Sequence, residues 1–168
     1  MTHRGAPGRP TAVALPGALL VGVLALAGCT ASGETGADPG DLTAADVAQA
    51  RERWEQGGWQ DYSYVLEGTC GEQQLVGRWA ARVVDGAVAE VAATTPGGWT
   101  PTSDRYGDIP TVPALFDRLD AAVAGDGIVQ ATFSPHVGYP MALVLDPMPD
   151  SVDDETCLTV SAVTPLDP

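Results

Sequence analysis

Apolar residues recur along the chain with two different periods, and each period predicts one kind of secondary structure. Thr43 and Asp46 have the spacing of a capping box, and the apolar positions that follow them share one helical face. This pattern predicts a helix over 43–56. A second stripe with helical spacing runs from Val112 to Val123 and predicts another helix.

Alternation of apolar and polar residues predicts six strands, three after each helix. A strong two-residue hairpin signal, Asp85-Gly86, joins the second and third strands. A long Thr-, Pro- and Gly-rich segment, 94–110, is expected to be a loop. The expected strands cover 62–66, 75–84, 87–93, 128–133, 139–145 and 157–163.

The order helix, three strands, helix, three strands predicts an α+β fold. Because the alternation is one-sided, we expect an antiparallel sheet that two helices cover on one face. A tandem duplication of the helix and three strands is the alternative organisation. The two halves share no residue pattern that can be aligned.

The first residues of the chain have the pattern of an export signal. Two arginines, Arg4 and Arg9, precede an apolar run that ends in Leu26-Ala27-Gly28-Cys29. These last four residues resemble the lipobox of bacterial lipoproteins, in which the cysteine is lipidated and the chain is cut before it. A transmembrane helix is the alternative, but the run is short and has an early proline, Pro16.

This pattern divides the chain into three parts. Residues 1–28 are the expected signal peptide, residues 29–41 a lipidated flexible tether, and residues 42–168 a single domain. Several acyl chains on Cys29 would hold the protein far more firmly than one chain would. We therefore expect a lipid-anchored protein on the extracytoplasmic face of the cell membrane.

Charge narrows the range of partners. The expected mature chain carries all 22 acidic residues, and its only basic residues besides histidine are arginines. A field of this sign repels nucleic acid and anionic lipid surfaces. We expect no nucleic-acid partner, contact with the membrane through the lipid alone, and an envelope protein as a further candidate partner.

The three cysteines support the same compartment. Lipidation of Cys29 would leave Cys70 and Cys157, which an oxidising exterior favours joining in a disulfide. The alternative is two free buried thiols.

Several segments, in their order and spacing, resemble DUF6174, an uncharacterised family of bacterial lipoproteins. Together these segments cover most of the expected domain. The resemblance implies a location and a domain type and supplies no activity. The matching segments are Arg53-Trp54, Asp61-Tyr62-Ser63-Tyr64, Cys70-Gly71-Glu72, Val84-Asp85-Gly86, Pro110-Thr111-Val112, Leu115-Phe116, Gly138-Tyr139-Pro140, Leu145-Asp146 and Asp153-Asp154-Glu155-Thr156-Cys157.

An acidic segment between the last two expected strands is the one candidate metal site. Hard cations such as calcium need several oxygen ligands brought together on a loop. The spacing does not match an EF-hand, and we favour a solvated acidic turn without a cofactor. The candidate ligands are Asp146, Asp150, Asp153, Asp154 and Glu155.

Two aromatic residues are candidate binding residues. Trp99 lies in the long loop, where a large ring either covers the core or anchors a partner. Tyr139 precedes Pro140 at a strand start, where it is either a contact residue or part of a turn. A further concentration of rings would suit ligand stacking, although core packing is the interpretation we favour. Its members are Trp54, Trp59, Tyr62 and Tyr64.

Enzyme signatures are missing from the sequence. His136 has no nucleophile motif near it, and we assign no catalytic residue. The expected function is therefore a non-catalytic binding or protein-interaction domain. The alternative is a carboxylate-based or calcium-dependent hydrolase of envelope material, because paired carboxylates assemble only in space.

Overall fold

The computed structural model describes residues 42–71, 75–94, 98–151 and 154–166. All of them belong to the second of the two units into which the chain divides, Ala37–Pro168. The expected signal peptide and tether, with Cys29, lie outside the described residues. None of the helices in the described part is long and apolar enough to cross a membrane.

The elements follow the predicted order of helix, three strands, helix, three strands, and this confirms the α+β class. The long loop before the second helix contains a short 3-10 helix that the periodicity did not predict. The elements are α1 (Ala44–Gln56), β1 (Tyr62–Cys70), β2 (Gly77–Val84), β3 (Ala87–Ala93), η2 (Ser103–Asp108), α2 (Val112–Val123), β4 (Ile128–Phe133), β5 (Pro140–Asp146) and β6 (Thr156–Pro165).

Two local motifs form as their residues dictate. The Thr43 side chain accepts a hydrogen bond from the Asp46 amide, and the Asp46 carboxylate accepts one from the Thr43 amide, which completes a capping box before α1. Asp85 and Gly86 both have positive φ, 50° and 75°, as a type I′ hairpin turn between β2 and β3 requires.

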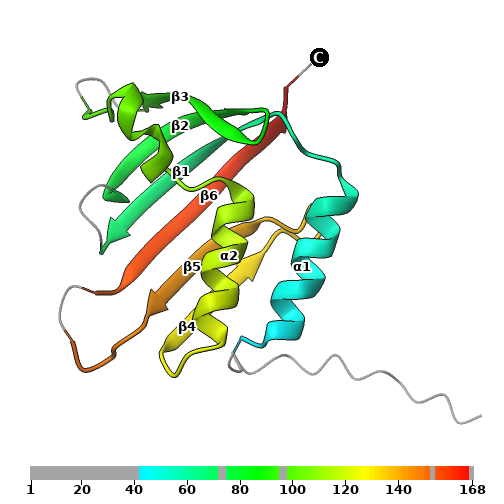
Figure 1. Cartoon of the computed structure of the whole chain (residues 1–168), viewed down its shortest axis with the longest axis vertical. Helices are drawn as coiled ribbons and strands as arrows, with labels where there is room; N and C mark the ends of the chain where they lie inside the picture. The colour runs from blue at the N-terminus through cyan, green and yellow to red at the C-terminus, as the bar shows by residue number, and fades with distance from the viewer. Residues whose placement is uncertain (1–41, 72–74, 95–97, 152–153, 167–168) are drawn as a thin grey trace, which may run out of the picture. The chain divides into compact units, whose positions relative to one another are not determined.

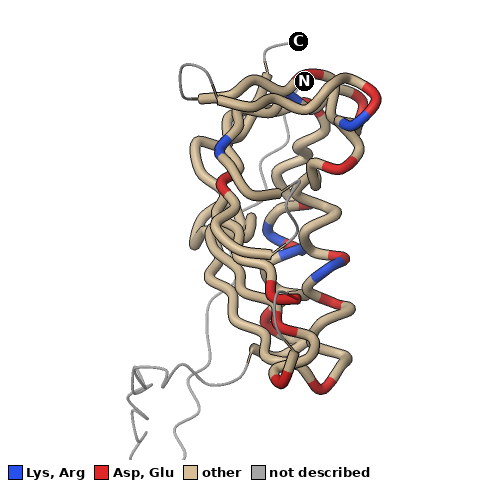
Figure 2. The backbone as a smooth tube through the Cα atoms, turned by 90° about the vertical axis from the view of Figure 1, so that its left-hand side faces the viewer, with Lys and Arg blue, Asp and Glu red and all other residues tan. Residues whose placement is uncertain are grey.

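The six strands form one antiparallel sheet in the order β3-β2-β1-β6-β5-β4 (Figure 1). The first and last strands of the domain, β1 and β6, are neighbours at its centre. Each group of three strands is a meander joined to the other through this central pair. Both helices lie on one face of the sheet, as expected (Figures 1 and 2).

The arrangement of the two halves argues against a tandem duplication. Three antiparallel pairings separate β1 from β4, so these equivalent strands run in opposite directions. The rotation that places β3-β2-β1 on β6-β5-β4 would therefore turn the sheet over. A duplicated helix would then lie on the opposite face, whereas α1 and α2 share one face (Figure 1).

The core lies between the sheet and the helices. Tyr62, Tyr64 and Leu66 of β1 are almost fully buried beneath α2 and the segment before it, while the residues between them face the other side of the sheet. Burying each large apolar side chain contributes about 1.5–3 kcal/mol. The apolar stripe of α2 supplies Val112, Leu115, Phe116 and Leu119 to this core.

The turn between β4 and β5 packs closely against α1. Gly138 has a φ of 92°, and a Cβ atom there would overlap the carbonyl oxygen of Ala50. It would also lie 2.9 Å from the Cβ of Arg53. Glycine is therefore required, and this contact helps to hold α1 beside the sheet.

Candidate functional site

The two cysteines of the domain form the predicted disulfide. Cys70 is the last residue of β1, and it lies opposite Cys157 of β6 with a Cα–Cα distance of 5.1 Å. The bond joins residues 87 positions apart, across the two central strands. It braces the sheet where the two meanders meet.

Trp99 is an exposed ring on an anchored backbone. Its side chain is 56% exposed, and its carbonyl accepts a hydrogen bond of 3.0 Å from the indole of Trp79. The two rings make an edge contact at 6.2 Å. The neighbouring Thr100 hydroxyl accepts a hydrogen bond from Ala93, so the segment is tied to β3. The structure thus places Trp99 on the surface.

Tyr139 forms part of a turn that packs against the core. It is half-buried and packs against the core, just before β5. Its carbonyl accepts a hydrogen bond of 2.9 Å from the Ser134 amide, which closes the turn that contacts α1.

The acidic segment does not bring a metal-ligand set together within the described residues, where no three His, Cys, Asp or Glu side chains converge. Asp150 is exposed, and Asp153 lies outside the described residues. One oxygen of Asp146 and both carboxylate oxygens of Asp154 are buried without a hydrogen-bond partner in the described part.

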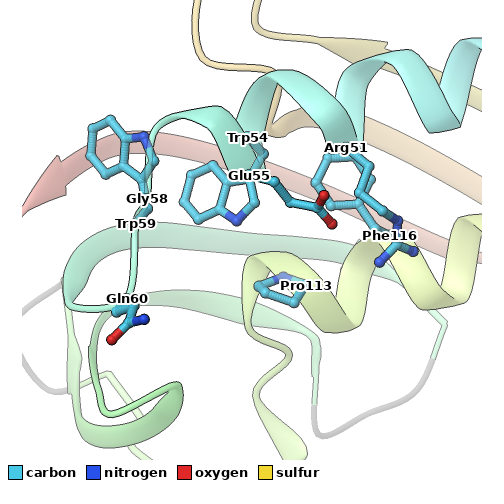
Figure 3. A pocket seen from close by; sticks show the side chains of 8 residues that line it. All are labelled: Arg51, Trp54, Glu55, Gly58, Trp59, Gln60, Pro113 and Phe116. Carbon is cyan, nitrogen blue, oxygen red and sulfur yellow. The ribbon is translucent and has the colours of Figure 1, made fainter.

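An open surface pocket of about 230 Å³ lies where the end of α1 meets the beginning of α2 (Figure 3). We call it the α1–α2 pocket. One wall comes from α1 and the residues that follow it, and the other comes from the first turns of α2. It is lined by Arg51, Trp54, Glu55, Gly58, Trp59, Gln60, Pro113 and Phe116.

Two tryptophans form the first wall of the pocket. The rings of Trp54 and Trp59 are stacked, with centroids 5.5 Å apart and planes 18° apart. Trp54 is 4% exposed and also contacts Tyr62 edge to face at 5.1 Å. Trp59 is half-buried. The pair therefore extends from the core to the surface.

Two glycines after α1 make this stack possible. Gly58 has a φ of 62°, which ends the helix and turns the chain back toward it. A Cβ atom on Gly57 would overlap Nε1 and Cδ1 of Trp59. The indole therefore occupies the space that a side chain at Gly57 would need.

Tyrosine hydroxyls of β1 hold the second wall in place. Tyr64 donates a hydrogen bond of 2.6 Å to the carbonyl of Pro110, and Tyr62 accepts one of 2.9 Å from the amide of Val112. Burial raises the pKa of both phenols, so both are neutral at physiological pH. These bonds fix the start of α2, and with it the position of Pro113.

Ion pairs fix the charged side of the pocket. The Arg51 guanidinium lies 3.1 Å from Asp117 and 2.6 Å from Asp120, and it stacks over the Phe116 ring at 5.1 Å. Its side chain is only 25% exposed. Glu55 is exposed at the rim.

One family model matches the part of the chain that contains this pocket. The profile of a family of unknown function, DUF6174, matches residues 46–165, from the first turn of α1 to the last residue of β6. The chain belongs to DUF6174. No curated protein and no solved structure matches the chain. The function of this DUF6174 domain is therefore inferred from the site itself.

The sequence pointed to only one of the two walls of the α1–α2 pocket. The aromatic concentration around Trp54 and Trp59 was a recognisable signal, and the structure places Trp54 in the core, as favoured. Trp59 is half-buried, packs against the core and also lines the pocket. The other wall, Pro113 and Phe116, carried no binding signal, because its residues look like the start of a buried helix.

Proposed function

We propose that this DUF6174 protein is a lipoprotein anchored through Cys29, and that its domain binds a ligand in the α1–α2 pocket without catalysis. The lining residues support binding. They include one partly exposed ring, Trp59, and one carboxylate, Glu55, whereas a carboxylate-based hydrolase requires two. They include no histidine, serine or cysteine.

The observation that carries this proposal is the position of the pocket along α1. The described chain begins beside the first turn of α1, and the pocket lies at the other end of that helix (Figures 1 and 3). Thirteen residues of helix span about 20 Å. The pocket therefore lies about one helix length from the residue at which the described chain begins.

The anchor is tested by replacing Cys29. The variant Cys29→Ser, expressed in the native host, is expected to leave the membrane fraction, while the unchanged protein stays there with an acylated N-terminal cysteine in its mass spectrum. Equal membrane retention of both proteins would contradict the anchor.

Binding is tested on the soluble Cys29→Ser protein. Solubilised envelope fragments of the host are expected to slow amide hydrogen exchange at the end of α1, from Trp54 to Gln60, relative to the protein alone. An unchanged exchange rate over these residues would contradict a binding function at this pocket.

A further inference from the structure

The two outer strands of the sheet differ in how their free edges are protected (Figure 1). η2 packs against β3, which carries the charged Glu90, and the amide of Ala93 at the end of β3 donates to the Thr100 hydroxyl. β4 has no such protection among the described residues, where it pairs with β5 alone. Its six residues, 128–133, include no charge and no proline, which are usual means of blocking an edge. β4 therefore presents unpaired backbone N–H and C=O groups.

The side chains of β4 are only partly covered on both faces of the sheet. Val129, Ala131 and Phe133 lie on the helix side, at the margin of the core, and all three are half-buried. There Phe133 stacks on Phe116 of α2 at 6.2 Å. Ile128 is 47% exposed. A strand added beside β4 would cover the three helix-side residues with its own alternate side chains. This edge therefore matches an extended segment with an apolar residue at every second position.

An arginine without a partner lies beside the turn that follows β4. The Cβ atom of Arg53 would lie 2.9 Å from a Cβ atom at Gly138 in this turn. The Nε atom of Arg53 is buried without a hydrogen-bond partner, and Arg53 forms none of the ion pairs among the described residues. A buried donor without an acceptor is destabilising, and a carboxylate is a particularly strong acceptor. A bound segment with an acidic residue at this end would satisfy Arg53.

Charge favours a peptide over a second copy of the chain as the occupant of this edge. The chain has a net charge of −14, so two copies repel each other. A wholly acidic segment is repelled for the same reason. A segment with one carboxylate meets an uncharged strand along its length and places that carboxylate beside Arg53.

We infer that the free edge of β4 binds an extended, largely uncharged peptide segment of another protein as an added strand. Alternate apolar residues of this segment face the helices, and one acidic residue lies beside Arg53. Backbone hydrogen bonds provide the affinity of such a complex, and the alternating side chains provide its selectivity. No residue of β4 lines the α1–α2 pocket, so this site is independent of the function proposed for the pocket.

The test uses soluble Cys29→Ser protein and short labelled peptides in which valine and threonine alternate, with one glutamate at either end. At least one peptide is expected to bind saturably by fluorescence anisotropy and to slow amide hydrogen exchange over 128–133. Exchange over 87–93, at the opposite edge, is the internal control. Unchanged exchange over 128–133 with every peptide, or equal slowing at both edges, would overturn the inference.

The role of Arg53 is tested by exchanging charges. Replacing the peptide glutamate by glutamine should weaken binding several-fold. Arg53→Glu should reverse the preference toward a peptide with lysine at that position, an effect that loss of stability alone does not produce. The matched control Arg82→Glu alters an exposed arginine of β2 and should leave the preference unchanged. The same preference in all three proteins would refute the contact with Arg53.

A second copy of the chain is the competing occupant. In an antiparallel pairing of two β4 strands about Gln130, this residue would face its own copy, so Gln130→Cys would form a disulfide-linked dimer. We expect this variant to stay monomeric under oxidising conditions. Rapid formation of the linked dimer, with no binding of any peptide, would replace the peptide by a second copy.

Discussion

Replacing Gly57 by alanine tests the structure of the tryptophan wall without replacing a core residue. Gly57 has helical dihedral angles, φ −72° and ψ −16°, so the backbone accepts alanine without strain. The new Cβ atom would occupy the space of the Trp59 indole, which must move away from Trp54. The variant therefore removes the stacked pair while every buried residue keeps its side chain.

Two effects on stability oppose each other, and the loss is the larger of the two. Losing the aromatic pair costs about 0.5–1.5 kcal/mol beyond the area it buries. Exposing part of the Trp59 ring costs about 1 kcal/mol more. Replacing glycine by alanine at a compatible position restores about 0.4–1 kcal/mol. We expect the free energy of unfolding to fall by about 0.5–2 kcal/mol.

Circular dichroism measures the stacking of the two indoles, and thermal unfolding measures the stability. The exciton band of the paired indoles should disappear in Gly57→Ala, while the melting temperature moves by only a few degrees. Gly107→Ala is the matched control, because a Cβ atom there meets no other atom within 4 Å. An unchanged exciton band would refute the stacked arrangement, and a large fall in melting temperature would refute the estimate of its energy.

Three further predictions concern stability. Reduction, or the Cys70→Ser and Cys157→Ser double variant, should lower the free energy of unfolding in urea by about 4–5 kcal/mol, because the bond closes a loop of 87 positions; equal urea midpoints would contradict this. Tyr62→Phe should cost about 1–3 kcal/mol in the same assay, because it leaves the buried Val112 amide without its acceptor, and a neutral result would mean that the amide finds another. Hydrogen bonds from Thr43 lower the pKa of Asp46, so the stability it provides is present above its ordinary pKa of 3.8 and is lost as pH falls through the lower folded value. Asp46→Asn should therefore flatten the melting temperature between pH 5 and pH 2, and profiles that stay parallel would count against the capping box.

Patterns along the chain predicted the position of one of the two tryptophans of the candidate site. The sequence indicated Trp54 as a core residue because it lies on the apolar face of its helix. The sequence did not show whether the Trp59 ring lies in the core or at the surface, because Trp59 follows two glycines and belongs to no helical or strand period. The structure gives Trp59 its role through the space left at Gly57 and through a wall that α2 supplies.

The same limit applied to the acidic segment. Its composition suggested ligands for a hard cation, but a metal site depends on convergence in space. Within the described residues, no three such side chains converge.

Local interactions are what the sequence by itself determined. Capping at Thr43, the apolar stripe of α2 and the Asp85-Gly86 turn each depend on residues a few positions apart, and the helices and strands formed where these patterns predicted them. Tertiary structure alone decided that β6 returns to the centre of the sheet beside β1, and that the end of α1 meets the start of α2. The physical reason is that strand pairing and helix packing join segments far apart in the chain, whose complementarity exists only once both surfaces have formed.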